Sequence, residues 1–201
     1  MIRYHISLFA LALIACLLQQ FMPAVPALFD SRILLLHLVF LCCAVTVGFP
    51  PMLGLAFLCG FLWDANNTLG SQGGDPEIYI HQTDSLRFGY SILLFGLMGL
   101  VMQSIQPLFR KGAWQMSAIL TGISIFLYFL VAFCLITFIR GEVIFPARVL
   151  YQIWITAALT MLCSPVIFAL LFKLAKLFDY TIRYDGLKRR YFTQSSYSLD
   201  D

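Results

Sequence analysis

Long apolar stretches recur along most of this chain, and they constrain its fold more than any other feature. Of the 201 residues, 61% are hydrophobic and 11% are charged, and the mean hydropathy is +0.87. A soluble domain of this size would expose much of this apolar surface and aggregate. A lipid bilayer solvates such a surface, so the sequence predicts an integral membrane protein.

Six apolar segments are predicted to be helical membrane spans, because in lipid each backbone polar group must find its partner within its own helix. The third is short for a hydrocarbon core of about 30 Å, and the fifth is long enough to tilt. Two consecutive prolines in Gly48-Phe49-Pro50-Pro51 predict a tight turn between the second and third spans. The expected fold is an all-α bundle of six transmembrane helices over residues 1–178, followed by a basic and aromatic tail at 179–201. The six spans cover residues 6–22, 31–47, 52–65, 88–105, 113–139 and 149–172.

The distribution of Lys and Arg predicts that both termini are cytoplasmic. With the N-terminus inside, nine of the 13 basic residues lie on the cytoplasmic side and four lie outside. The loop 66–87 then faces the exterior. We expect the first span to be retained, although 13–16 resembles a lipobox and 25–27 has the small residues of a signal-peptidase site. The predicted location is the bacterial inner membrane, with several passes.

Composition and cysteine placement argue against several classes of site. The net charge of +3 does not suggest a nucleic-acid partner, whereas the basic and aromatic tail suits anionic lipid headgroups. All six cysteines lie in apolar runs, without metal-ligand spacing, so we expect them to be small packing residues. We expect no metal and no cofactor. The cysteines are Cys16, Cys42, Cys43, Cys59, Cys134 and Cys163.

Asp64 places a carboxylate where the third span meets a polar loop, and an ionisable group at a membrane edge is a functional-site hypothesis. It could act as a general base together with His81. Alternatively, it could cap a helix end or accept hydrogen bonds from neighbouring backbone groups. Small residues in two spans predict close helix packing: Gly54, Ala56 and Gly60 in the third, and Gly89, Gly96 and Gly99 in the fourth.

A transport path would require polar groups threaded through the middle of the membrane. His37 is the best single candidate in the spans, but no chain of carboxylates continues from it. A lone histidine in an apolar run is more often hydrogen-bonded to a neighbouring helix than part of a proton relay.

The order of these signals resembles the bacterial rod shape-determining MreD family. The resemblance begins with Leu17-Leu18-Gln19-Gln20-Phe21-Met22-Pro23 and continues through Gly54 to Gly60-Phe61-Leu62-Trp63-Asp64, a Gly-rich helix ending in an acid. Leu69-Gly70 follow as in the family, whereas 71–87 departs from its pattern as an insertion. Pro165-Val166-Ile167-Phe168 and the following Lys173 are similar to the family's last helix.

The resemblance implies a non-enzymatic scaffold in the machinery that elongates the cell wall and maintains cell shape. Members of the family associate with the bitopic protein MreC. Through it they join the glycosyltransferase RodA, a class B penicillin-binding transpeptidase and MreB filaments. Their fold is thought to be similar to the substrate-binding subunits of energy-coupling-factor vitamin transporters. The resemblance, the small residues and the acid together give the candidates for structural or partner contacts. These are Gly54, Gly60, Trp63, Asp64, Gly70, Gly89 and Pro165.

Two other functions remain open. A vitamin-transporter subunit would hold a soluble ligand between its helices, with 66–87 as a lid. A membrane enzyme would require Asp64 or His81 for turnover.

Overall fold

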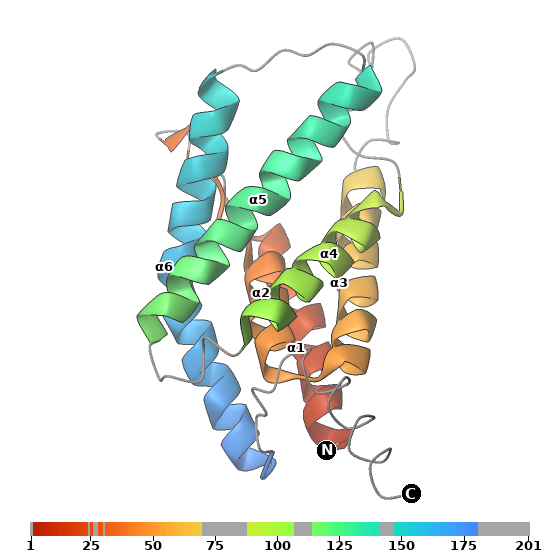
Figure 1. Cartoon of the computed structure of the whole chain (residues 1–201), viewed down its shortest axis with the longest axis vertical. Helices are drawn as coiled ribbons and strands as arrows, with labels where there is room; N and C mark the ends of the chain where they lie inside the picture. Colours follow the sequence, from red (N-terminus) through yellow and green to blue (C-terminus); the bar gives the residue numbers. More distant parts are fainter. Residues whose placement is uncertain are drawn as a thin grey trace, which may run out of the picture.

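Where the structure describes it, the chain folds into six helices, which confirms the predicted all-α class. The structure is a computed structural model, and it describes residues 2–23, 25, 28–29, 31–69, 88–106, 114–140 and 147–180. Within these residues the one β contact is an isolated bridge between Val25 and Ser31. The helices are α1 (Ile2–Gln20), α2 (Leu35–Thr46), α3 (Phe49–Leu69), α4 (Tyr90–Ile105), α5 (Trp114–Arg140) and α6 (Ala147–Leu177) (Figure 1).

Three of the helices are long and apolar enough to cross a membrane: α1, α6 and the Ala118–Phe138 part of α5. In contrast, α2 and α4 are apolar but have only 12 and 16 residues. Their lengths are about 18 and 24 Å, less than a hydrocarbon core of roughly 30 Å. Helix length and composition are therefore those of a membrane protein, whereas six complete crossings stay a prediction.

The predicted turn between the second and third spans is wrong in its extent. Only Val47 and Gly48 separate α2 from α3, and Pro50 and Pro51 lie in the first turn of α3. Proline is tolerated there because the first N–H groups of a helix have no acceptor inside the helix. A proline pair can thus open a helix, and the sequence alone did not distinguish this from a turn.

Successive helices run in alternating directions, so the start of α1 and the end of α6 lie at the same end of the bundle (Figure 1). At this end the ring of Tyr4 stacks on Tyr180, with centroids 4.2 Å apart. The Tyr4 hydroxyl also donates a hydrogen bond to Thr46 Oγ1 at 3.1 Å. We call this the Tyr4 end. The opposite end, where α3 ends and α4 begins, is the Asp64 end.

The end of α6 is closed by backbone hydrogen bonds. Asp179 has a positive φ of 48°, the Tyr180 N–H donates to the Ala175 carbonyl at 2.9 Å, and the Asp179 N–H donates to Lys176 at 3.3 Å. This pattern is a Schellman motif, which satisfies carbonyl groups that would otherwise lack partners at a helix end. It also turns the chain back, so that Tyr180 reaches Tyr4.

Helix α2 is the centre of the bundle. Every residue from Leu36 to Thr46 is buried, and α2 packs against all five other helices. A helix surrounded by protein needs an apolar surface on all sides rather than one apolar stripe, which agrees with its nearly unbroken apolar sequence.

The α5–α6 pair extends beyond the other helices at the Asp64 end (Figure 1). The Leu34 N–H, just before α2, donates to Thr160 Oγ1 at 3.3 Å. The start of α2 is therefore level with the middle of α6. Helix α6 begins at Ala147, about 20 Å farther along its axis.

Candidate functional site

Asp64 is buried at the junction of α3 and α4, where its carboxylate supports the start of α4. Its side chain is 4% exposed, and its Oδ2 accepts a hydrogen bond from the Gly89 N–H at 2.7 Å. Gly89 is the N-cap residue of α4 and cannot cap the helix with a side chain of its own. A carboxylate near a helix N-terminus interacts favourably with the unpaired N–H groups and the helix dipole. The capping alternative drawn from the sequence is the one that this geometry favours.

The backbone of Gly89 is adapted to this contact. Its φ of +101° lies in a region that side-chain-bearing residues rarely adopt, and an added Cβ would meet no atom within 4 Å. Glycine is therefore required here by its conformation and not by space.

Gly60 lets α3 and α4 approach one turn away from this junction. A Cβ at Gly60 would lie 2.5 Å from the Cα and 2.7 Å from the backbone nitrogen of Ile92. No side chain fits between these two backbones, so the close packing predicted from the small residues is confirmed here. Gly54 instead faces α1, where a Cβ would lie 3.2 Å from the Phe9 ring.

Trp63 joins this junction to a cluster of aromatic rings around His37. His37 is the third residue of α2 and is 2% exposed. Its ring centroid lies 4.5 Å from both Trp63 and Tyr128, at interplanar angles of 86° and 75°. Phe95 and Phe129 complete the cluster at 4.7 and 5.5 Å. Four helices, α2 to α5, thus each contribute a ring.

Neither ring nitrogen of His37 has a hydrogen-bond partner among the described residues. The sequence-based expectation of a hydrogen bond to a neighbouring helix is therefore not met, because the surrounding residues present rings and not polar groups. The Tyr128 hydroxyl is also buried and makes no well-aligned hydrogen bond with the described residues, although Ser91 lies beside it. Buried polar atoms without partners are rare in proteins, and His37 and Tyr128 together contribute three of them among the described residues.

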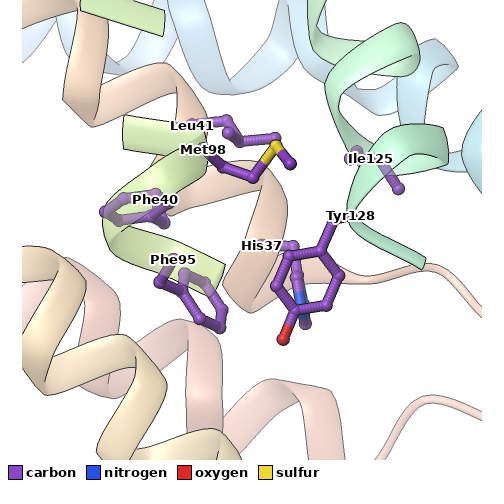
Figure 2. A pocket seen from close by; sticks show the side chains of 7 residues that line it. All are labelled: His37, Phe40, Leu41, Phe95, Met98, Ile125 and Tyr128. Atoms are coloured by element: carbon purple, nitrogen blue, oxygen red, sulfur yellow. The ribbon is translucent and has the colours of Figure 1, made fainter. Parts of the chain in front are cut away.

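A cavity of about 10 Å³ lies beside His37 and Tyr128 (Figure 2). Its other walls are apolar side chains of α2, α4 and α5, including Phe40, Met98 and Ile125. This volume is about that of one water molecule. It is far below the several hundred Å³ of a small-molecule site.

Two glutamines at the Tyr4 end hold the last turn of α2. Gln103 Nε2 donates to the Ala44 and Val47 carbonyls at 2.8 and 2.7 Å. Gln106 Nε2 donates to the Val45 carbonyl at 2.6 Å. Carbonyls in the last turn of a helix have no donor inside that helix, and the two buried glutamines supply the donors here.

Gln19 performs the equivalent function at the start of α2. Its Oε1 accepts from the Leu35 N–H at 2.6 Å, and its Nε2 donates to the Ile33 carbonyl at 2.9 Å. The amide therefore bonds the backbone on both sides of Leu34, at the point where α2 begins. Sequence reasoning singled out none of these contacts. The signal available was the placement of glutamines at the ends of apolar segments.

Of the remaining candidates, the structure describes only Pro165. Pro165 is half-buried inside α6, away from Asp64, and Ser164 beside it is fully buried. Gly70 and His81 lie outside the described residues, so the pairing of Asp64 with His81 stays a hypothesis.

Among the described residues, no three His, Cys, Asp or Glu side chains come together in a way that could hold a metal ion. All six cysteines are unbonded thiols. Four of them are buried, in agreement with a packing role, whereas Cys134 is exposed and Cys163 is half-buried.

Comparisons with known proteins add no relative: no protein-family model, no curated protein and no solved structure matches this chain.

Proposed function

We propose that this chain is a non-catalytic membrane scaffold that organises other membrane proteins through its helices. The observation that carries the proposal is the use of Asp64. Within the six helices this is the one carboxylate, and it is buried and accepts a hydrogen bond from the backbone N–H of Gly89. A general base must reach the proton of a substrate, and a buried carboxylate that is already hydrogen-bonded to the backbone supports a structural role instead.

The partners in this proposal follow from the resemblance to the MreD family. They are an MreC-like bitopic protein and, through it, a RodA-type glycosyltransferase, a class B penicillin-binding transpeptidase and MreB filaments. Exposed apolar side chains on α4 and α6 supply surface that either lipid or a partner helix can cover, as at Leu93 and Leu162. The proposed role is to support cell-wall elongation in the bacterial inner membrane.

The proposed orientation places the Tyr4 end in the cytoplasm. Lys173 and Lys176 are exposed near the end of α6, and Arg3 is exposed at the start of α1. Exposed Tyr151 and Trp154 lie near the opposite end of α6. Basic residues on the cytoplasmic side and aromatic residues at an interface are the usual arrangement for membrane helices.

A vitamin-transporter subunit is the alternative. The cavity beside His37 is too small for a vitamin, so this function would require a ligand site elsewhere or a different conformation.

Affinity purification of the tagged chain from its native cells in mild detergent, followed by mass spectrometry, tests the proposal. We expect an MreC-like protein and the glycan polymerase in the eluate, and rounded cells on depletion of the chain. Recovery of an ATPase module or a vitamin would favour the transporter subunit. Normal cell shape after depletion, with neither wall-synthesis protein recovered, would reject the scaffold function. An Asp64→Asn variant that inserts and folds but loses all function would favour an enzyme.

A further inference from the structure

At the Asp64 end, the level along the bundle axis at which exposed polar or interfacial side chains begin differs between α6 and α1. On α6, exposed Tyr151 and Trp154 mark one interface, and exposed Lys173 marks the other. Tyr151 and Lys173 are about 33 Å apart along the helix, close to the thickness of a hydrocarbon core. This side of the molecule therefore fits an ordinary bilayer.

The polar end of α1 lies at a lower level than Tyr151 on α6. Gln19 bonds the backbone at Ile33 and Leu35, and the Leu34 N–H between them bonds Thr160. These hydrogen bonds set Gln19 level with Thr160, which is about 13 Å below Tyr151 on α6. The end of α1 thus lies well inside the membrane if the bilayer is flat around the whole protein.

At this level the surface carries exposed amides. Gln20 Nε2 donates to Asn66 Oδ1 at 3.2 Å, and both residues are exposed. The amide of Asn66 donates further to Cys16 Sγ, whereas the Gln20 carbonyl oxygen has no partner among the described residues. An exposed amide in hydrocarbon loses its hydrogen bonds to water without replacement, which costs several kcal/mol.

We propose that the bilayer is thinner along the α1–α3 side of the protein, so that water and lipid headgroups reach Gln20 and Asn66. The lipid leaflet at the Asp64 end is lowered there by about 10 Å relative to its height at Tyr151 and Trp154 on α6. Local thinning is a known response of a bilayer to a short hydrophobic segment, and here it satisfies the exposed amides. This inference concerns the surrounding lipid and is independent of the scaffold function.

Spin labels at matched heights test this. Single cysteines are introduced at Gln20 or Phe21, which are exposed at the end of α1, and at Ala158 or Leu162 on α6. Ala158 and Leu162 lie within about 3 Å of the level of Thr160. The background carries Cys134→Ala and Cys163→Ala, since the other four cysteines are buried. The protein is reconstituted in phosphatidylcholine and phosphatidylglycerol vesicles, and each label is exposed to oxygen, which concentrates in lipid, or to a water-soluble nickel chelate.

We expect labels at 20 and 21 to relax mainly with the nickel chelate and labels at 158 and 162 mainly with oxygen. Oxygen-dominated relaxation at all four positions would mean a flat leaflet at the height of Tyr151 and would overturn the proposal. Nickel-dominated relaxation at all four would mean a flat leaflet at the height of Gln20 and would overturn it equally. Each variant must retain the melting temperature of the parent protein. Phe21→Cys keeps the test valid if the loss of Gln20 disturbs folding.

Discussion

The Asp64 carboxylate accepts the backbone N–H of Gly89 at 2.7 Å and thereby joins the end of α3 to the start of α4. The two residues are 25 positions apart in the sequence, and their hydrogen bond links the two helices. Asp64 therefore acts at this point as the N-terminal cap of a helix to which it does not belong.

We expect Asp64→Ala to destabilise the protein by about 1.5–3 kcal/mol, because it leaves a partly buried N–H without an acceptor. Asp64→Asn should cost less, since the amide oxygen can accept the same hydrogen bond. Melting temperatures of the purified protein in detergent measure the difference. Equal loss of stability in both variants would mean that the charge, rather than the hydrogen bond, is required.

Gly60→Ala should destabilise the α3–α4 packing by about 1–3 kcal/mol, because the new Cβ would overlap the Ile92 backbone, which cannot move away as a side chain could. Gly96→Ala is the matched control. Gly96 also lies inside a helix, but an added Cβ there meets nothing within 4 Å, so its effect should be neutral or slightly stabilising. Similar melting temperatures for the two variants would contradict this packing.

Gln103→Leu should lower the melting temperature, since the Ala44 and Val47 carbonyls lose a shared donor inside the core. The expected destabilisation is about 1–3 kcal/mol. Ser104→Ala, one residue away, removes an exposed hydroxyl that bonds only its own helix at Leu100, and it should have little effect. A harmless Gln103→Leu would show that water reaches the end of α2.

Gln19→Glu and Gln19→Leu separate the two hydrogen bonds at the start of α2. Glutamate keeps the acceptor for the Leu35 N–H but loses the donor to the Ile33 carbonyl, whereas leucine loses both. We therefore expect the stability of Gln19→Glu to lie between those of wild type and Gln19→Leu. Hydrogen exchange at Leu35, measured by mass spectrometry, should increase in Gln19→Leu more than in Gln19→Glu. The opposite order would show that a carboxylate is not tolerated at this depth.

His37→Phe should leave the melting temperature unchanged or raise it, because the substitution replaces two buried nitrogens without partners by carbon in a ring of similar size. Tyr128→Phe should also leave the melting temperature unchanged or raise it, since the Tyr128 hydroxyl is buried and makes no well-aligned hydrogen bond. Strong destabilisation by either change would reveal a polar partner of that side chain. Loss of biological activity at unchanged stability would assign the pair a function.

The sequence by itself determined the class of the protein and the approximate position of its helices. Long apolar runs and scarce charge allow little other than membrane helices, because helix formation satisfies backbone hydrogen bonds locally. It also marked Asp64 and Gly60, since a carboxylate and small residues are conspicuous in an apolar segment.

The tertiary structure decided what the polar residues do. Whether Asp64 caps a helix or faces a ligand depends on Gly89, and the roles of Gln19 and Gln103 depend on the ends of α2. The surroundings of His37 depend on rings from three other helices. These contacts join residues far apart in the chain, and local sequence patterns carry no information about which helix ends will meet.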